Sequence, residues 1–320
     1  MLFSKDIGII GYGTYLPPQR ISSEEIEQRQ GKSGQGIAKS LGIISKTVPG
    51  EDEDAITMAI EAGLDCFARF PKLDKQQVGA LFVGSESHPY AVKPSGTVIA
   101  SALGLPETLA MADFQFACKA GVQAMLAAIA YVGSGMAELG IGIGSDTAQA
   151  KPGNMLEFSA AAGAACFVVS TQNLVAKFLG AVSIATDTPD FWRRPGFAHP
   201  EHAGRFTGGP AYFAHVQKSS TLLLEELHKT PKDFTYCVFH TPNAKFPKII
   251  ATHLGFTKTQ LKHSLIVEHI GNTYAAATLL ALANVLDHAK KGDEIFVASY
   301  GSGAGSDAIA LKVLKNGKLS

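Results

Sequence analysis

Cysteine and tryptophan are scarce in this chain, which has four cysteines and one tryptophan among its 320 residues. No two cysteines form a CxxC pair, so the sequence lacks the spacing of a zinc site or a dithiol redox motif. All four lie in apolar segments, which predicts reduced thiols in a cytoplasm-like compartment. They are Cys66, Cys118, Cys166 and Cys237.

A surplus of charge of one sign is also missing, since 28 lysine and arginine residues balance 28 aspartate and glutamate residues. A balanced chain has no broad cationic field to attract nucleic acid or anionic membranes. The first residues lack the basic and apolar regions of a signal peptide, and no uninterrupted apolar run has membrane-spanning length. We expect a soluble, unprocessed, cytoplasmic protein that acts on small molecules and contacts neither nucleic acid nor membrane.

Hydrophobic residues are abundant, at 46% of the chain, which is enough for one large core or two fused cores. Short apolar runs that end at glycine or small polar residues predict buried strands, and alanine-rich segments with apolar residues three and four positions apart predict helices. The strands are expected at 7–13, 78–85, 139–145, 166–170, 237–240 and 295–300, and the helices at 55–70, 119–132, 219–228 and 273–289. Their alternation predicts an α/β fold.

The second half of the sequence echoes the first. In each half a strand ends in a polar segment, FVGSES or CVFHTPN, and a small-residue turn, ACKAG or IGNTY, then opens a long helix. We therefore divide the chain into two related halves, residues 1–170 and 171–320. Cys118 and Asn272 stand at corresponding turns and are expected to face a shared centre at two helix N-termini. Residues 186–217 have little periodicity and are expected to form a long functional loop.

Two residues stand where a nucleophile and an acid would be placed, although each has a plain structural alternative. Cys118 precedes a helix, whose N-terminus lowers the pKa of a thiol, but buried cysteine is common in protein cores. His240 follows a strand at the edge where open α/β sheets bind ligands, and a histidine there can equally hold its own loop. The other nine histidines show no metal-ligand spacing.

Two further polar residues complete the candidate site. Glu86 stands just beyond a strand, where dry surroundings would raise the pKa of a catalytic carboxylate, though loop carboxylates are usually solvated. Asn272 suits an ordinary helix cap as well as an amide that orients His240 or donates to an oxyanion. The glycine-rich turn at 301–305 matches no phosphate-loop or dinucleotide pattern, and it suggests close approach of the backbone to a substrate.

Taken together, eight segments resemble the archaeal-type 3-hydroxy-3-methylglutaryl-CoA synthases of the thiolase superfamily over nearly the whole chain. The eight segments are SKTVPGEDEDA, GSESHPYAVKP, FACKAG, TPDFWRR, GRFTGGPAYF, FHTPNAKFP, IGNTY and YGSGAGSDA. They occur in that family's order and at compatible separations, and no single segment would be enough to identify the family. The resemblance implies a five-layered αβαβα thiolase fold built from two similar halves. It also implies a homodimer that acts on acetyl-CoA and acetoacetyl-CoA, in the mevalonate pathway to isoprenoid precursors, without metal or redox cofactor.

The resemblance carries the family's roles to particular residues of this chain. Cys118 matches the nucleophile that takes the acetyl group, and Glu86 matches the base. His240 matches the acid beside the acetoacetyl carbonyl, and Asn272 matches the amide near it. The positions expected to bind substrate are Arg193, Asn243, Lys245, Lys248, Tyr274 and Ser302, the two lysines lying where the family has basic residues near the CoA phosphates.

The expected chemistry separates this reading from its nearest alternatives. A thiolate stores the acetyl group as an activated thioester, and a base must then remove a weakly acidic methyl proton. A ketoacyl-ACP synthase III-like enzyme obtains its carbanion by decarboxylation and needs no glutamate, so the segment GSESHPY favours the synthase. A thioester hydrolase with the same cysteine and histidine, or a scaffold subunit without catalysis, would be a different class of function.

A few departures from the family pattern bear on substrate preference more than on reaction type. Val122, Thr241 and His269 stand in or beside motifs where the family has other residues. They leave open a second substrate assignment, in which a carrier protein in place of CoA carries one acyl group, as in relatives that install branches on polyketides. The resemblance also implies a complex with an acetoacetyl-CoA thiolase and a small zinc-ribbon/OB-type protein.

Overall fold

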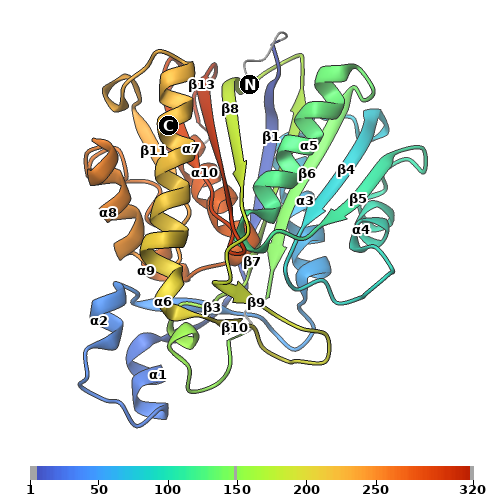
Figure 1. Ribbon diagram of the computed structural model, residues 1–320. Coiled ribbons are helices and arrows are strands. Elements are labelled where there is room, and N and C mark those ends of the chain that lie inside the picture. Colours follow the sequence, from blue (N-terminus) through green and yellow to red (C-terminus); the bar gives the residue numbers. More distant parts are fainter. Residues whose placement is uncertain (1–5, 148–149, 318–320) are drawn as a thin grey trace.

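The computed structural model describes residues 6–147 and 150–317, and its main feature is one mixed sheet of nine strands (Figure 1). Their order is β11-β12-β13-β8-β1-β7-β6-β4-β5. The strands are β1 (Gly8–Tyr15), β4 (Val78–Gly84), β5 (Ala110–Phe114), β6 (Leu139–Asp146), β7 (Gly163–Ser170), β8 (Ala176–Ala185), β11 (Tyr236–Phe239), β12 (Glu294–Ala298) and β13 (Gly305–Val313). Two small sheets pair β2 (Gln19–Ser22) with β3 (Ser45–Val48), and β9 (Phe191–Trp192) with β10 (Glu201–His202).

The nine-stranded sheet consists of two half-sheets with the same internal order. From the centre outwards, the first reads β1-β7-β6-β4 and the second β8-β13-β12-β11, and in each only the outermost of these pairs is parallel. β5 extends the first half-sheet only. The two half-sheets join through β1 and β8, which are paired over only two residues of each strand. The division drawn at residue 170 falls between β7 and β8 and stays an interpretation.

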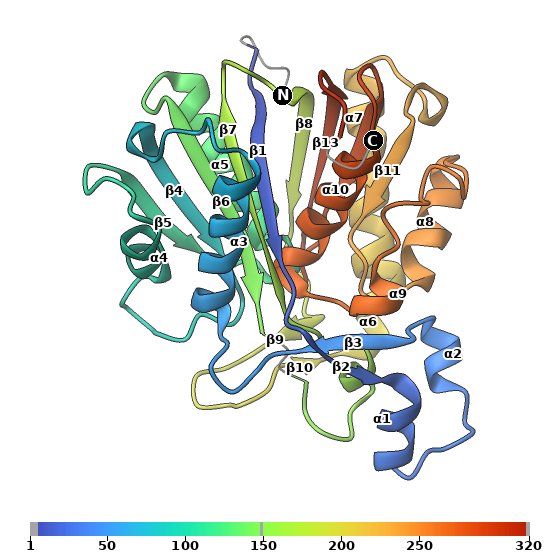
Figure 2. The same ribbon diagram turned by 180° about the vertical axis from the view of Figure 1, so that it is seen from behind.

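Helices cover both faces of each half-sheet, as Figures 1 and 2 show for α3 and α5. The helices are α1 (Ser23–Arg29), α2 (Ile37–Leu41), α3 (Ala55–Arg69), α4 (Ser95–Leu103), α5 (Ala120–Ser134), α6 (Gly204–Phe206), α7 (Ala214–Glu226), α8 (Lys245–Leu254), α9 (Val267–Ile270) and α10 (Ala277–His288). Three apolar cores separate the layers. One surrounds α5 and α10, one lies under α3 and α4, and one lies under α7 and α8. This is the αβαβα order expected of a thiolase fold.

Helix α5 lies in the central layer because small residues let it approach its neighbours closely. A Cβ atom added at Gly84 would lie 2.1 Å from the carbonyl oxygen of Ala120, and one at Gly121 would lie 2.3 Å from that of Ala275. The segment Ala117–Ser134 is apolar and long enough to cross a membrane by length and composition, but more than half of it is buried in the core. A helix that is buried over most of its circumference needs little polar surface, which explains its composition.

The two central helices begin with the same backbone turn. A short 3-10 helix, η2 (Ala117–Lys119), precedes α5, and another, η6 (Tyr274–Ala276), precedes α10. The first residue of each has a positive φ, 43° at Ala117 and 51° at Tyr274. Cys118 therefore corresponds to Ala275. The expected match of Cys118 with Asn272 is wrong by three positions, because the turn is defined by backbone conformation that the small-residue pattern does not reveal.

All six predicted strands and all four predicted helices are present within a few residues of their expected bounds. The prediction of an irregular loop at 186–217 is wrong from residue 204 onwards, which is nearly half of that segment. There α6 runs into a π-helix, η4 (Thr207–Phe213), which continues as α7. Two glycines and Pro210 are poor helix formers, and they hide this helix from a reading of local propensity.

Candidate active site

A cavity of about 180 Å³ lies where the first turns of α5 and α10 meet the carboxyl end of β11. It brings together Cys118 from η2, His240 from the residue after β11, and Asn272 from the residues before η6. Aromatic side chains form much of the remaining wall, among them Phe191, Tyr212, Tyr274 and Tyr300. Three of the four predicted catalytic residues thus line one small, largely apolar cavity.

Glu86, the fourth predicted residue, contacts the nucleophile directly. The Cys118 thiol donates to Glu86 Oε1 over 3.3 Å. Cys118 is 7% exposed, and its burial, together with the Glu86 carboxylate, raises the pKa of the thiol well above its ordinary value. The expectation that the helix N-terminus would lower this pKa is wrong, because burial and the neighbouring carboxylates outweigh the helix. The thiol therefore needs a base, and Glu86 is in place to accept its proton.

Glu86 titrates far above the range of a solvated carboxylate. Burial, followed by the charge of Asp146, raises its pKa to about 8, and this outweighs the lowering effect of the Cys118 hydrogen bond and of Arg193. The guanidinium of Arg193 donates to the backbone oxygen of Glu86 over 3.0 Å. A carboxyl group with such a pKa exchanges a proton readily near neutral pH.

The sequence analysis missed Asp146, which connects the two helix starts. Its carboxylate accepts from Ser85 Oγ and the Glu86 backbone N–H, at 2.7 and 2.8 Å, and from Ser87 Oγ at 2.6 Å. It also accepts from the backbone N–H of Ala275 at 2.7 Å. Ala275 is the residue of the second half that corresponds to Cys118 in the first. Asp146 thereby fixes Glu86 relative to η6. Its position just after the glycine–serine end of β6 is the only signal in the sequence.

His240 is 1% exposed, and its Nδ1 atom has no hydrogen-bond partner within the described residues. Burial lowers the pKa of the imidazole to about 3, so the ring is neutral at physiological pH. Its backbone oxygen accepts from Tyr212 Oη over 2.7 Å, and its backbone N–H donates to Ala298 over 2.9 Å. The main chain of His240 is held firmly, and its ring is available to a ligand in the cavity.

The side chain of Asn272 holds the turn that precedes η6. Its Oδ1 accepts the backbone N–H of Tyr274 over 3.0 Å, and its backbone N–H donates to Ser159 over 2.7 Å. The side chain thus shapes the turn before η6 without capping α10 itself. Since Oδ1 is used in this way, the NH₂ group is the part of the amide that can donate to a ligand.

A second missed carboxylate supports the far wall of the cavity. Asp190 is completely buried and accepts from Tyr300 Oη and from the backbone N–H of Gly303, each over 2.7 Å. It thereby joins the segment before β9 to the glycine-rich turn after β12, which carries Ser302. Asp190 lies within TPDFWRR, where only Arg193 was predicted to have a role.

Five of the six predicted substrate-binding residues lie in two groups, and the sixth, Arg193, contacts the backbone of Glu86. Asn243, Tyr274 and Ser302 line the cavity, and Asn243 also accepts the backbone N–H groups at the start of α8 over 2.9 and 3.0 Å. Lys245 and Lys248 lie on the first turns of α8, outside the cavity lining, and Lys248 Nζ contacts Glu268 Oε1 at 2.7 Å. The two lysines therefore do not contact a group enclosed in the cavity.

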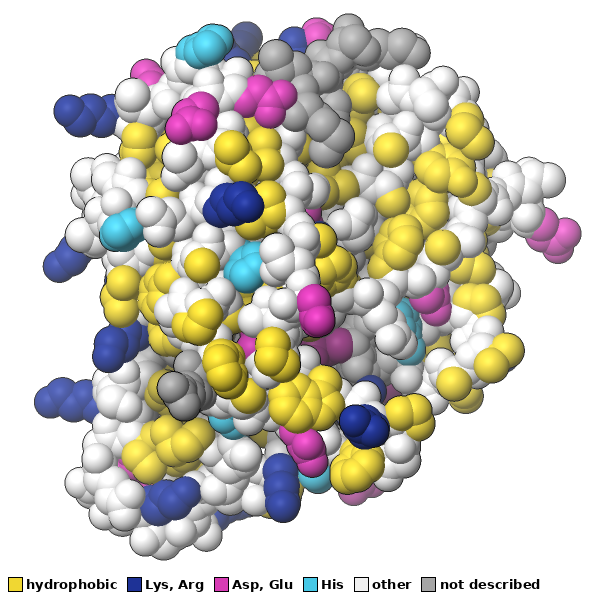
Figure 3. Space-filling view, viewed as in Figure 1, with side chains coloured by type: hydrophobic (Ala, Val, Ile, Leu, Met, Phe, Trp, Pro, Cys, Tyr) yellow, Lys and Arg dark blue, Asp and Glu magenta, His cyan; other side chains and the backbone are white. Residues whose placement is uncertain are grey.

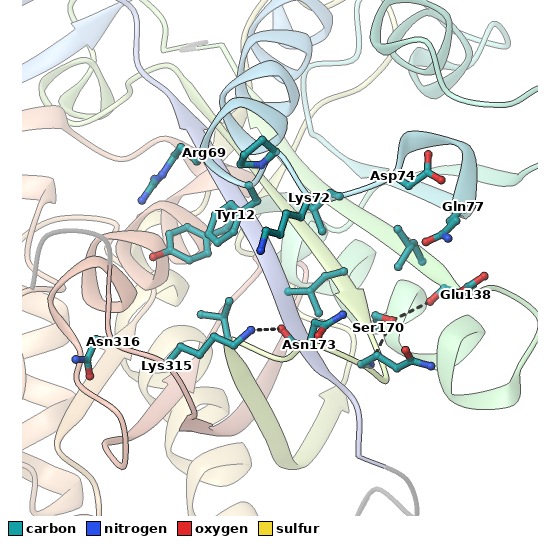
Figure 4. Close-up of a pocket in the computed structure, with 17 residues that line it drawn as sticks. Tyr12, Arg69, Lys72, Asp74, Gln77, Glu138, Ser170, Asn173, Lys315 and Asn316 are labelled. Atoms are coloured by element: carbon teal, nitrogen blue, oxygen red, sulfur yellow. Dashed lines mark hydrogen bonds between the residues drawn. The ribbon is translucent and has the colours of Figure 1, made fainter.

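The surface around β9, β10 and α6 carries hydrophobic side chains next to basic ones (Figure 3). The exposed hydrophobic residues of this region are Trp192, Phe197 and Phe206. A larger cavity of about 580 Å³ lies elsewhere, and Figure 4 shows residues such as Tyr12, Arg69 and Lys315 around it. None of the predicted catalytic residues lines that cavity, so size alone does not mark the reactive site. Within residues 6–147 and 150–317, no three His, Cys, Asp or Glu side chains are grouped to hold a metal ion.

Comparison with known proteins agrees with this geometry. A family model for the carboxyl-terminal part of 3-oxoacyl-[acyl-carrier-protein] synthase III matches residues 224–313. The fold resembles a crystal structure of HMG-CoA synthase complexed with CoA, with a TM-score of 0.88, 20% identity, and coverage of 97% of this chain and 83% of the other. It resembles 3-oxoacyl-(acyl carrier protein) synthase III from Pseudomonas aeruginosa equally, with a TM-score of 0.87, 19% identity, and coverage of 98% and 99%. These two likenesses show that the chain has the fold that both kinds of synthase share.

Sequence identity separates families that the fold alone leaves together. The chain is 49% identical to the hydroxymethylglutaryl-CoA synthase of Methanopyrus kandleri over 313 residues, which is 98% of this chain and 89% of the relative. The chain belongs to the hydroxymethylglutaryl-CoA synthase family.

Proposed function

We propose that this protein condenses acetyl-CoA with acetoacetyl-CoA, through an acetyl thioester on Cys118, to give 3-hydroxy-3-methylglutaryl-CoA and free CoA. The contact of 3.3 Å between Cys118 Sγ and Glu86 Oε1 carries the proposal. A nucleophile touching its own base is useful when that base must next act on the group the nucleophile has taken up. Membership of the family supports the same reaction.

The first step transfers the acetyl group. Glu86 accepts the thiol proton, and the thiolate of Cys118 attacks the carbonyl carbon of acetyl-CoA. The thiolate of CoA leaves and takes the proton back from Glu86, so free CoA is released and Glu86 is a carboxylate again. Because its pKa is about 8, Glu86 is well matched to a proton that must be taken and returned within one step.

The second step forms the carbon–carbon bond. Glu86 removes a methyl proton from the acetyl group on Cys118, and the resulting enolate attacks the ketone carbon of acetoacetyl-CoA. His240, which is neutral because its pKa is about 3, donates a hydrogen bond to the ketone oxygen and then protonates the alkoxide. The methyl proton held by Glu86 then passes to His240, so that the imidazole is neutral and Glu86 is a carboxylate again. Water finally hydrolyses the thioester on Cys118 and releases the product.

The size of the cavity favours short acyl groups. A volume of about 180 Å³ is below the usual range for pockets that enclose a drug-sized ligand, so only the acyl ends of the substrates can be enclosed. The CoA moieties would then extend over the surface near β9 and β10, within reach of Arg193. Lys245 and Lys248 are the proposed partners of the CoA phosphates, because ammonium groups bind phosphate as point charges.

The remaining expectations concern assembly and compartment. We propose a homodimer, since β5 has no neighbouring strand on its outer side among the described residues and exposed strand edges favour pairing with another chain. All four cysteines are free thiols, in keeping with a cytoplasmic location. A complex with a thiolase and a zinc-ribbon/OB-type protein also remains part of the proposal.

Intact-mass measurement tests the proposal directly. Exposure to acetyl-CoA should add one acetyl group to the native protein and none to Cys118→Ala. Adding acetoacetyl-CoA should then remove the group and yield a six-carbon acyl-CoA. Release of acetate without the six-carbon product would indicate a thioester hydrolase, and turnover of malonyl-carrier protein in place of acetoacetyl-CoA would indicate a synthase III-like enzyme.

A further inference from the structure

A buried ion pair between Lys119 and Asp307 lies next to the turn that carries Cys118. We propose that Lys119 and Asp307 form a positioning pair that fixes Cys118 relative to the cavity wall supplied by the second half of the chain. The inference rests on the proposed function, because it concerns the rate at which Cys118 is acylated. Neither residue touches the cavity, so the pair acts through the turn that carries Cys118.

The Lys119 side chain enters the interior between the two halves. Lys119 follows the nucleophile in sequence, and its side chain is 2% exposed. Its Nζ lies 2.9 and 2.8 Å from the two carboxylate oxygens of Asp307 and 2.9 Å from Gln123 Oε1. It also lies 4.2 Å from the ring centre of Phe116. All three ammonium donors therefore have acceptors, and these contacts fix the position of Nζ.

The Asp307 carboxylate belongs to the second half of the chain and is completely buried. It stands on β13, whose backbone is tied to the end of β12. The Ser299 N–H donates to the Asp307 backbone oxygen over 2.8 Å, and the Asp307 N–H donates to Ser299 Oγ over 3.2 Å. Between these positions lie Tyr300 and Ser302, which line the cavity. The ion pair thus joins the Cys118 turn to the wall opposite it.

Two glycines allow this close approach. A Cβ atom added at Gly301 would lie 2.4 Å from the Phe116 carbonyl oxygen and 2.8 Å from Lys119 Cγ. One added at Gly305 would lie 2.8 Å from the Phe116 ring and 3.0 Å from Lys119 Cε. The glycine-rich turn of the sequence therefore packs against the nucleophile turn and Lys119, and its glycines are needed for this fit.

The turn that carries Cys118 needs such support. Ala117 has a φ of 43°, in the left-handed region that residues with a Cβ atom adopt only at a free-energy cost. A strained conformation persists only where its surroundings hold it. On the carboxyl side of Cys118, the anchored ammonium group of Lys119 provides that hold.

Stability alone is a poor explanation for this pair. Removing two charges from water is costly, and replacing a buried ion pair by apolar residues often leaves stability unchanged or increases it. Removing one partner leaves an unpaired buried charge and destabilises the fold strongly. A double variant therefore separates positioning of Cys118 from support of the fold.

The test combines Lys119→Met with Asp307→Leu and measures the rate of Cys118 acetylation in single turnover by intact mass. We expect the unfolding temperature to stay near that of the native protein and the KM for acetyl-CoA to be unchanged. The acetylation rate constant should fall by about 10- to 100-fold, because a displacement of about 1 Å has an effect of that order. The pH at which the rate is half-maximal should not move, since the pair as a whole is neutral.

A matched control uses an ion pair distant from the cavity. Lys229 Nζ and Glu294 Oε2 are 2.7 Å apart, and Glu294 is at the opposite end of β12 from Tyr300. Lys229→Met combined with Glu294→Leu should leave the acetylation rate at its native value. A loss of rate in this control as large as in the Lys119 and Asp307 variant would overturn the proposal.

Two other results would overturn it as well. One is a native acetylation rate in the folded double variant, and the other is a reduced rate that recovers at high pH, which would mean that Lys119 acts on the thiol by charge. If the double variant does not fold, Asp307→Glu keeps both charges and displaces the carboxylate by one methylene group. That variant should fold and acetylate Cys118 at least about tenfold more slowly, and a native rate would reject positioning. Failure of the native protein to acetylate Cys118 would count against the proposed function instead.

Discussion

The two half-sheets share strand order, strand direction and a strained turn before a central helix, yet they contribute opposite chemistry to the cavity. The first half supplies Cys118 and Glu86, groups whose pKa values are raised by burial and which exchange protons. The second half supplies His240, neutral at physiological pH, and the amide of Asn272. Where the first helix start carries a thiol, the second carries Ala275. A repeated scaffold thus fixes two matching positions, and side chains alone decide which one reacts.

The largest effect should follow from exchanging these two positions. Cys118→Ala should reduce condensation by at least about 10³-fold, since the covalent intermediate is lost. Ala275→Cys in that background should not restore it, because Ala275 does not line the cavity. The carboxylate next to it, Asp146, already accepts four hydrogen bonds from the protein. Product assays on both variants test this, and restored turnover would show that the halves are interchangeable.

Removing the base should separate the two chemical steps. Glu86→Gln should lower condensation by about 10²- to 10⁴-fold, because a methyl proton is far less acidic than a thiol proton. Acetylation of Cys118 should be slowed less, since hydroxide can also generate the thiolate. Single-turnover acetylation and steady-state condensation, measured on the same preparation, give the comparison. Equal losses in both steps would assign Glu86 to activation of the thiol alone.

In the second half of the chain, His240→Asn should lower the rate of condensation and leave the rate of Cys118 acetylation unchanged. A hydrogen-bond donor to the developing alkoxide is worth about 10²- to 10³-fold in rate. Asparagine keeps a donor of smaller reach, so we expect a loss near the lower value. The same two assays apply, and a variant that fails to become acetylated would move His240 into the first step.

The contrast between the halves also predicts the pH dependence. Condensation needs the carboxylate form of Glu86, so its rate should rise about tenfold per pH unit below the pKa near 8 and level off above it. Because the pKa of His240 is about 3, no inflection near pH 6.5 is expected. For stability the sign of the Glu86 contribution is opposite, because the folded state binds the extra proton between about pH 4.5 and 8. The lowered pKa of His240 opposes this contribution up to about pH 6.5, where the unfolded state is the one that binds a proton. The free energy of unfolding should therefore fall as pH rises between about pH 6.5 and 8. Rate profiles and denaturant unfolding of native protein and Glu86→Gln check both statements.

The smallest effect concerns the support of His240. Tyr212→Phe removes the 2.7 Å hydrogen bond to the His240 backbone oxygen and leaves a buried acceptor unsatisfied. The free energy of unfolding should fall by about 1–3 kcal/mol, and condensation should fall only a few-fold while acetylation is unchanged. Denaturant unfolding with both rate assays measures this. An unaltered condensation rate would show that the imidazole keeps its place without the tyrosine.

Local patterns in the sequence predicted the elements that carry the site. Apolar runs gave the strands that end at Glu86 and His240, and the small-residue turn gave the helix start at Cys118. β8 and β13 were not predicted, because their pairing depends on partners distant in the chain. The helical character of 207–213 was missed because glycine and proline disfavour helices locally. In this segment the tertiary packing around Tyr212 outweighs that low helix propensity.

The sequence by itself determined most of the strands and helices around the site, the repeated pattern of the two halves and the family, because periodicity and motifs are properties of neighbouring residues. Only the tertiary structure decided how the site works. The contacts that set its chemistry join residues 32, 129 and 188 positions apart, between Cys118 and Glu86, Ala275 and Asp146, and Lys119 and Asp307. Burial then shifted the pKa values of the thiol, the carboxylate and the imidazole, and burial depends on the packing of the whole chain.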